Sequence, residues 1–213
     1  MLKVKSFSDA AYEEIKNRII KGIYKPGESL NERNLSNDFG ISRTPVREAL
    51  QKLSMEGWVL NAPYKKNEVR KFSLEDIVEA QKVRSALEVL AIKEIVDKIT
   101  HADLKHLEKL VEKQKKTPDH DKFIQIDREF HDYIYEKSNN SLLISLMENI
   151  NDIVRYFGIL ALDLPGRNEV AIIEHENILE ALRKKDINLV VEKMEAHMEN
   201  TTAAIVKRSQ IME

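Results

Sequence analysis

The stretch NERNLSNDFGISRTPVREALQKLSMEG, which runs from Asn31 to Gly57, decides the fold of the N-terminal part of the chain. It contains two short helical patterns that are interrupted at Gly40. Glycine is favoured just past the end of a helix, where the backbone turns left-handed. Ser42 then follows as a natural N-cap, and Pro45 lies in the first turn of the next helix, where a missing N–H costs nothing. Two helices joined by a short turn that contains glycine predict a helix-turn-helix.

The second of these helices sorts its residues onto two faces. An apolar stripe with the spacing i, i+4, i+7 consists of Val46, Leu50 and Leu53. A second face, near the N-terminal end, carries Arg43, Thr44 and Arg47. The N-terminal residues of a recognition helix reach base edges in the major groove, and arginine suits guanine. We therefore expect these three residues to read DNA, with Arg33 on the preceding helix as a phosphate or base contact. The spacing alone also permits a helical hairpin whose arginines are only solvated.

Composition predicts a globular protein that does not enter a membrane. The 213 residues suffice for one large domain or two small ones, and 42% of them are hydrophobic while 33% are charged. No apolar run approaches the length of a membrane span, and the N-terminus leads into no signal-peptide core. The chain has no cysteine, which excludes disulfides and thiolate sites and fits a cytoplasmic location.

The net charge of −2 conceals an asymmetry along the chain. Residues 1–70 carry 13 Lys and Arg against 9 Asp and Glu, a net charge of +4, and the remainder carries −6. A basic N-terminal part is typical of a nucleic-acid binder. The acidic remainder would be repelled by phosphates and is expected to serve another purpose, and it holds all six histidines.

The predicted elements around the helix-turn-helix complete a winged helix within residues 1–72. An amphipathic helix is expected over residues 8–21, with Ser8 as its cap. Two short β-prone runs, residues 58–60 and 68–70, flank a basic tip and predict a β-hairpin wing.

Residues 73–213 show no strand pattern and predict a six-helix antiparallel bundle, so the whole fold is mainly α. Asn168 is expected to cap the fifth helix. The expected helices cover approximately residues 73–99, 100–116, 118–137, 142–162, 168–185 and 186–208.

A metal site is one interpretation of four residues in this bundle. Asp127 and His131 are four apart on one helix, so both side chains point the same way. His175 and His197 lie on or beside the apolar faces of the fifth and sixth helices. Imidazole and carboxylate ligands that converge from facing helices are how bundles build metal sites. The alternative is a pair of hydrogen-bonded core histidines and an ordinary helix-surface Asp–His contact.

The N-terminal third resembles the GntR family of bacterial transcription regulators. The resemblance rests on ISRTPVREALQKLSMEGWV and on KGIYKPGESLNERNLSNDFG before it. It implies that Arg33, Arg43, Thr44 and Arg47 contact DNA. Family wings usually carry a glycine at the tip, and residues 63–67 of this chain, PYKKN, do not. We therefore expect Lys65 and Lys66 to make the contact of the wing.

The bundle resembles the ligand-sensing C-terminal domain, called FCD, of the FadR-like branch of that family. The segments that carry the resemblance are RSALE at 84–88, DREFH at 127–131, Asn139-Asn140, and the run from Glu174-His175 to Leu182. The resemblance implies a divalent metal ion held by Asp127, His131, His175 and His197. It also implies that Arg84 faces the carboxylate of an effector, and we expect Asn149 and Arg155 to line the same cavity. Nitrogen and oxygen ligands favour zinc, with nickel, manganese or iron as alternatives.

These patterns together predict a DNA-binding transcription regulator rather than an enzyme. We expect a homodimer on a near-palindromic operator, with an operator affinity that a small carboxylic acid modulates at the metal site. One alternative is a metal-dependent phosphohydrolase, because His131-Asp132 is an HD dipeptide in an all-α context. Another is a structural DNA-binding protein whose sensor is vestigial.

Overall fold

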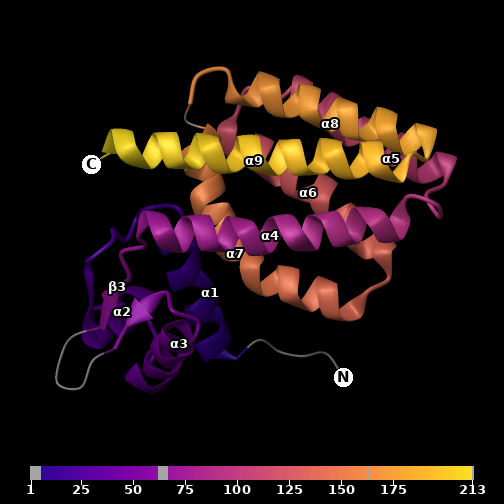
Figure 1. Cartoon of the computed structure of the whole chain (residues 1–213). Helices are drawn as coiled ribbons and strands as arrows, with labels where there is room; N and C mark the ends of the chain where they lie inside the picture. Colours follow the sequence, from indigo (N-terminus) through magenta and orange to yellow (C-terminus); the bar gives the residue numbers. More distant parts are fainter. Residues whose placement is uncertain (1–5, 62–66, 163, 213) are drawn as a thin grey trace. The chain divides into compact units, whose positions relative to one another are not determined.

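The computed structural model describes residues 6–61, 67–162 and 164–212. The chain forms two compact units, residues 1–73 and residues 74–213, and each is described by itself (Figure 1). Within the described part of the chain, no helix has both the length and the apolar character needed to cross a membrane.

The first unit is a winged helix, as predicted. Its helices are α1 (Phe7–Ile20), α2 (Glu32–Phe39) and α3 (Arg43–Met55), and both α1 and α2 pack against α3. The apolar stripe of α3 is buried in this packing, as its spacing requires. Trp58, directly after α3, is also buried and packs its ring edge-on against Phe72.

The wing belongs to a three-stranded antiparallel sheet rather than to an isolated hairpin. Strands β2 (Val59–Leu60) and β3 (Asn67–Val69) form the predicted hairpin, with Val59 opposite Val69. A further strand, β1 (Ser29–Leu30), pairs with the other edge of β3. The sequence did not predict β1, because two residues are too few to show a period-2 pattern.

The caps of this unit follow the predicted chemistry at the turn but not everywhere. Gly40 ends α2 with φ 66°, in the left-handed region. Asn31 caps α2 by accepting the backbone N–H groups of the first turn. Ser42 occupies the N-cap position of α3 without a side-chain hydrogen bond. The prediction of Ser8 as the cap of α1 was wrong: the helix begins at Phe7, and Ser6, two residues earlier, is the cap, whose side chain accepts the backbone N–H of Asp9.

The second unit is the predicted helical bundle. Its first helix ends at Ile95 instead of continuing to residue 99, and its last helix extends beyond residue 208. The cap expected at Asn168 was wrong, because Gly166 holds that position in a left-handed conformation and α8 starts at Arg167. The helices are α4 (Leu74–Ile95), α5 (His101–Lys115), α6 (His120–Ser138), α7 (Ser141–Leu162), α8 (Arg167–Lys184) and α9 (Ile187–Met212).

The packing of the bundle brings α6, α8 and α9 around one interior. Helix α4 packs against α6, α7 and α9, while α5 packs against α6 and α8 (Figure 1). Large buried side chains, among them Phe130, Ile134, Leu107 and Met194, fill this interior. Polar side chains that occur at the same depth are therefore exceptions that require partners.

Candidate metal centre

Three histidines from three helices meet inside the bundle. His131 lies on α6, His175 on α8 and His197 on α9, and their exposed fractions are 2%, 0% and 2%. One ring nitrogen of each lies within 4.8 Å of the corresponding nitrogen of the other two. The structure thus brings together three of the four residues expected to hold a metal ion.

The three rings share one orientation relative to their surroundings. Each Nδ1 faces a hydrogen-bond partner on another helix: Glu88 of α4 at 3.0 Å from His131, Gln114 of α5 at 2.9 Å from His175, and Glu174 of α8 at 2.8 Å from His197. When the Nδ1–H group of a neutral imidazole donates, its Nε2 carries the lone pair. The partners therefore select the tautomer in which Nε2 is the available ligand atom.

Two of the Nε2 atoms are buried acceptors without a partner in the described part of the protein, which suits coordination of a metal ion. Among the described residues, the Nε2 atoms of His131 and His175 are buried without any hydrogen-bond partner. Buried nitrogen acceptors without partners are costly, and such groups in a native fold call for an ion or a ligand. Neutral imidazoles that converge inside a bundle are a donor set for zinc, nickel, manganese or iron.

Burial keeps two of the histidines in the neutral form that a ligand needs. Desolvation lowers the pKa of His175 well below 6.5, and the neighbouring His197 and His131 add to this effect. Desolvation also lowers the pKa of His197, against the opposing effect of its hydrogen bond to Glu174. Both rings are therefore neutral at pH 7 without any metal ion.

Asp127, the fourth expected ligand, lies at the edge of the cluster. It is not among the residues whose donor atoms all lie within 4.8 Å of one another. Its Oδ1 lies 3.5 Å from His175 Nε2 and accepts a hydrogen bond of 3.3 Å from Gln114 Nε2. Gln114, which is 1% exposed, therefore orients both Asp127 and His175 through the two ends of one amide.

Behind His131, a buried carboxylate is itself paired with an arginine. Glu88 is fully buried and accepts hydrogen bonds from His131, from the Tyr135 hydroxyl and from Arg84 Nε at 3.2 Å. Burial would raise the pKa of Glu88, but His131 and Arg84 outweigh it and lower the pKa to about 2. Arg84, expected to face an effector, is thus in an ion pair through Nε, and its role toward a ligand stays a prediction.

The same arrangement recurs behind His197. Glu174 accepts from His197 and, at 2.9 Å, from Nη2 of the buried Arg167. Burial raises the pKa of Glu174, but His197 and Arg167 lower it overall. Arg167 Nη2 also donates to Thr201 on α9 at 2.8 Å. Two histidines of the cluster are thus each held by a carboxylate that an arginine neutralises.

Sequence reasoning missed these supporting residues. Glu174 directly precedes the candidate ligand His175, and Glu88 lies in the RSALE segment, but neither position by itself indicates a contact with a histidine. Nothing in the sequence around Gln114 or Arg167 marks them, because their partners lie on other helices or two turns away. Only the packing of α5 and α8 against their neighbours places them at the histidines.

The side chains expected to contact DNA are exposed on the first unit. Arg33 on α2, and Arg43, Thr44 and Arg47 at the start of α3, are all exposed. Arg47 forms an ion pair of 2.9 Å with Glu32, and its side chain is 59% exposed. Two groups of predicted site residues lie outside the described part of the structure: Lys65 and Lys66 on the wing, and the side chains of Asn149 and Arg155.

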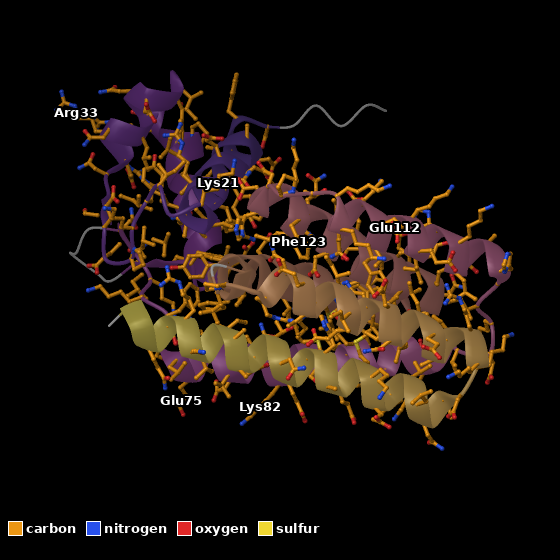
Figure 2. All side chains as sticks on the ribbon, turned by 90° about the horizontal axis from the view of Figure 1, so that it is seen from above. Lys21, Arg33, Glu75, Lys82, Glu112 and Phe123 are labelled. Carbon is orange, nitrogen blue, oxygen red and sulfur yellow. The ribbon has the colours of Figure 1, made fainter. Side chains whose placement is uncertain are left out.

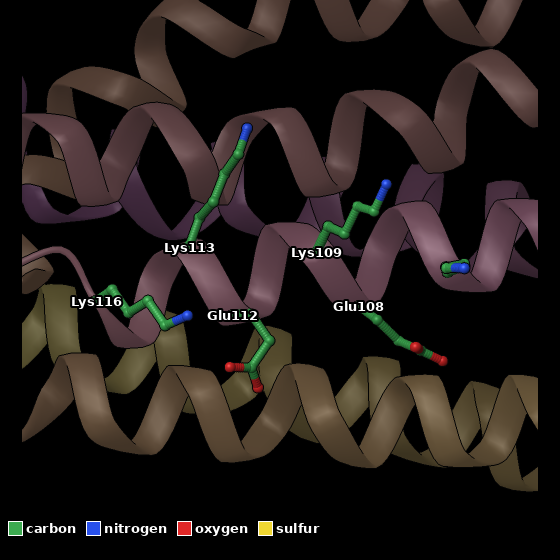
Figure 3. Close-up of a pocket in the computed structure, with 6 residues that line it drawn as sticks. Glu108, Lys109, Glu112, Lys113 and Lys116 are labelled. Atoms are coloured by element: carbon green, nitrogen blue, oxygen red, sulfur yellow. The ribbon is translucent and has the colours of Figure 1, made fainter.

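A hollow on the surface of the bundle is separate from the histidines. It has a volume of about 420 Å³ and follows one helix, α5, where long charged side chains stand at successive turns (Figure 3). Its lining consists of Lys105, Glu108, Lys109, Glu112, Lys113 and Lys116. None of these belongs to the histidine cluster or to its partners, and a row of charges on one helix is an ordinary solvated face.

Comparisons with known proteins agree with this architecture. Residues 79–200 match the model of the FCD domain, and residues 7–65 match the model of bacterial regulatory proteins of the gntR family. The chain is 30% identical to the uncharacterized HTH-type transcriptional regulator YdhC of Bacillus subtilis, over 87% of this chain and 85% of that protein.

Solved structures of similar fold include the Escherichia coli protein McbR/YncC, with a TM-score of 0.78 and 25% identity over 97% of this chain and 100% of that one. The metal-free FCD domain of TM0439 aligns with a TM-score of 0.60 and 25% identity, over 66% of this chain and 99% of that one.

A winged helix followed by a helical bundle with a buried histidine cluster defines a class of DNA-binding transcription regulators. The chain belongs to the GntR family, and its bundle is an FCD domain. Its relatives are transcription regulators rather than enzymes, so the phosphohydrolase alternative is wrong. The three histidines of the FCD domain could hold a metal ion.

Proposed function

We propose that this regulator binds a near-palindromic operator and that a small carboxylic acid at a metal ion in the bundle modulates its affinity. The observation that carries the proposal is the set of histidines whose ring nitrogens converge in the interior, two of the Nε2 atoms being without a partner among the described residues. Buried acceptors of this kind are costly when they stay unsatisfied, and one divalent cation can accept the lone pairs of all three imidazoles at once.

Operator reading is assigned to the N-terminal end of α3. Arg43, Thr44 and Arg47 are exposed there, where a recognition helix contacts base edges. Arg47 has a partner in Glu32, which holds its guanidinium in place. Arg33 contacts the backbone or a base edge, and Lys65 and Lys66 serve the wing.

The proposed regulator is a homodimer, whose two-fold symmetry would demand the near-palindromic operator, and the surface of α4 supports this. Val83 and Leu90 are 51% and 41% exposed, and they are seven residues apart on one face of the helix. Leu87, between them, is partly buried. We propose that this face contains part of the interface between two copies, since exposed apolar side chains gathered on one face mark association surfaces.

The metal site comprises His131, His175 and His197, with Asp127 as the fourth ligand. A divalent ion held there would offer its remaining coordination positions to a carboxylate. Gln114, Glu88 and Glu174 keep the imidazoles oriented and their Nε2 atoms available. Zinc suits the donor set best, and nickel, manganese or iron are compatible with it.

Two measurements test this function. The first is a gel-shift titration of the full chain against DNA from upstream of its own gene, with unrelated DNA as competitor. Binding that the competitor abolishes at equal concentration would contradict operator recognition.

The second measurement is elemental analysis of the purified protein and of His175→Ala. We expect about one metal ion per chain in the wild type and a large loss in the variant, with lower thermal stability. His120→Ala, in which an exposed histidine at the start of α6 is replaced, is the matched control and is expected to retain the metal. Metal-free wild-type protein of unchanged stability would instead support a vestigial sensor.

A further inference from the structure

Among the described residues of the bundle outside the proposed metal site, Gln81 on α4 is the buried side chain with the most polar atoms that lack a hydrogen-bond partner. It is 1% exposed, and among the described residues neither its Nε2 nor its Oε1 has a hydrogen-bond partner. A buried amide that makes none of its hydrogen bonds is costly, and native folds keep such groups when something else satisfies them. An ordered water or a bound ligand can satisfy such an amide, and the position of Gln81 bears on which of them does.

The position of Gln81 connects it to the histidine cluster. Gln81, Arg84 and Glu88 have the spacing i, i+3, i+7, so they share one face of α4, and all three are buried. Glu75 and Lys82, on the outer side of the same helix, point away from the bundle (Figure 2). Along the helix axis, Gln81 lies about 4.5 Å from the level of Arg84 and about 10 Å from that of Glu88, which holds His131.

The charges around the cluster limit what a ligand can carry. Arg84 is paired with Glu88, and Arg167 is paired with Glu174, so both pairs are neutral. A divalent ion with neutral imidazoles and Asp127 leaves a net charge of about +1, which a single carboxylate balances. A second carboxylate placed at Gln81 would be buried there without a counter-charge, which is expensive.

We propose that the effector is a monocarboxylate that also carries a neutral hydrogen-bonding group, a hydroxyl or an amide, and that Gln81 binds this group. The carboxylate end lies at the metal ion and Arg84, and the neutral end lies one helical turn or more toward the start of α4. Gln81 is thus a specificity-determining residue that separates hydroxylated or amidated acids from plain alkyl acids. This inference rests on the proposed function, in which a metal-held acid is the effector.

The test compares matched pairs of ligands on the full, metal-loaded protein. The probes are straight-chain monocarboxylates of three to six carbons, each with a terminal methyl, hydroxyl or primary amide group, and calorimetry measures their affinities. For at least one chain length, we expect the hydroxyl or amide acid to bind about fivefold or more tightly than the methyl acid, since a buried hydrogen bond contributes about 1 kcal/mol.

Two variants separate binding from folding. Gln81→Leu keeps the volume and removes the amide, so we expect it to lose the preference while it still binds the methyl acids. Without ligand, this variant is expected to be at least as stable to heat as the wild type, because it removes an unsatisfied buried group; a purely structural glutamine would predict the opposite. Gln125→Leu, which changes a glutamine on the exposed side of α6, is expected to retain the preference.

The ligand panel tests the carboxylate effector and the role of Gln81 separately. If no acid of the panel binds the metal-loaded protein, the proposed carboxylate effector is overturned, and the role of Gln81 falls with it. If acids bind but hydroxyl and amide groups give no advantage, or if Gln81→Leu retains the advantage, the inference about Gln81 alone is overturned.

Discussion

The side chains that hold the histidines are the decisive detail at the scale of single residues. His131 and His197 each donate to a carboxylate, whereas His175 donates to the amide of Gln114. An amide that accepts from His175 with its oxygen must present its nitrogen elsewhere, and that nitrogen donates to Asp127. One glutamine therefore fixes a histidine and a carboxylate together, which neither Glu88 nor Glu174 does.

Replacing Gln114 is predicted to weaken metal binding although Gln114 is not a ligand. Gln114→Leu removes the acceptor for His175 and the donor for Asp127, and loss of such a supporting contact costs roughly 10- to 100-fold in metal affinity. Competition with a metal-binding dye measures the affinity directly. Gln125→Leu provides the exposed control. Equal affinity in wild type and Gln114→Leu would show that the amide does not position the ligands.

The sequence revealed the histidines but not their supports, and the reason is physical. A histidine on an apolar helix face can be recognised from the sequence of that single helix, as for His175 among the isoleucines and leucines of α8. Gln114 is equally buried, yet its partners lie on α6 and α8. No pattern within α5 reports contacts between helices.

At the scale of elements, local chemistry predicted the helices well and the short strands poorly. The turn between α2 and α3 follows from Gly40, and α5 begins at a capping box formed by Thr100 and Asp103. These signals lie within a few consecutive residues. The strand β1 exists because β3 offers it an edge, which is a property of the folded sheet and not of Ser29 and Leu30.

The turn at Gly40 is predicted to be destabilised when the glycine is replaced. With φ 66°, an alanine there would occupy the left-handed region, so Gly40→Ala is expected to destabilise the winged helix by about 1 kcal/mol. Urea unfolding followed by circular dichroism measures the change. Gly158→Ala gives the opposite case, because this glycine is within α7 with no atom near its added methyl group. It is expected to leave stability unchanged or raise it by up to about 1 kcal/mol. A neutral Gly40→Ala would contradict the left-handed turn.

The cap of α5 is predicted to make the bundle sensitive to acid. Lys137, Thr100 and Tyr133 all bond to the Asp103 carboxylate and hold its pKa well below the usual range. A carboxyl whose pKa is lower in the folded state stabilises the fold above its unfolded pKa, near 4, and this contribution is lost as the pH falls below it.

Asp103→Asn keeps the shape and removes the charge, so the variant is expected to lose about 1–2 kcal/mol at pH 7 and to show a smaller further loss between pH 5 and pH 3. Thermal unfolding at a series of pH values measures both effects. Asp121→Asn, at an exposed position at the start of α6, is the control. Parallel pH profiles for wild type and Asp103→Asn would contradict the assigned role of the cap.

At the scale of the whole molecule, the charge is divided between two functions. The first 70 residues carry a net charge of +4 and the remainder carries −6. The basic part contains the exposed arginines of α2 and α3, while the acidic part encloses the histidines. The sequence predicted this division, whereas the wing residues 62–66 and the side chains of Asn149 and Arg155 lie outside the described part of the structure.

Replacing Arg43 and replacing Arg33 are predicted to lower the affinity for DNA in different ways. Arg43→Ala removes a contact to a base edge, so it is expected to cost about 1–3 kcal/mol on the operator and little on unrelated DNA. Arg33→Ala, if Arg33 contacts a phosphate, weakens both DNAs alike and lowers the salt dependence by about one counterion. Fluorescence anisotropy at several salt concentrations separates the two. If Arg43→Ala lost the same affinity for the operator and for unrelated DNA, Arg43 would not contribute to sequence recognition.

The most direct test of the central claim is the response of operator affinity to a carboxylic acid in wild type and in His175→Ala. Both proteins are titrated with the operator fragment in the presence and absence of the acids that bind the metal-loaded wild type. We predict that the acid changes the operator affinity of the wild type by at least fivefold, a coupling of about 1 kcal/mol, and leaves that of His175→Ala unchanged although the variant still binds DNA. The same response in both proteins, or none in the wild type, would contradict control of DNA binding through the histidine cluster.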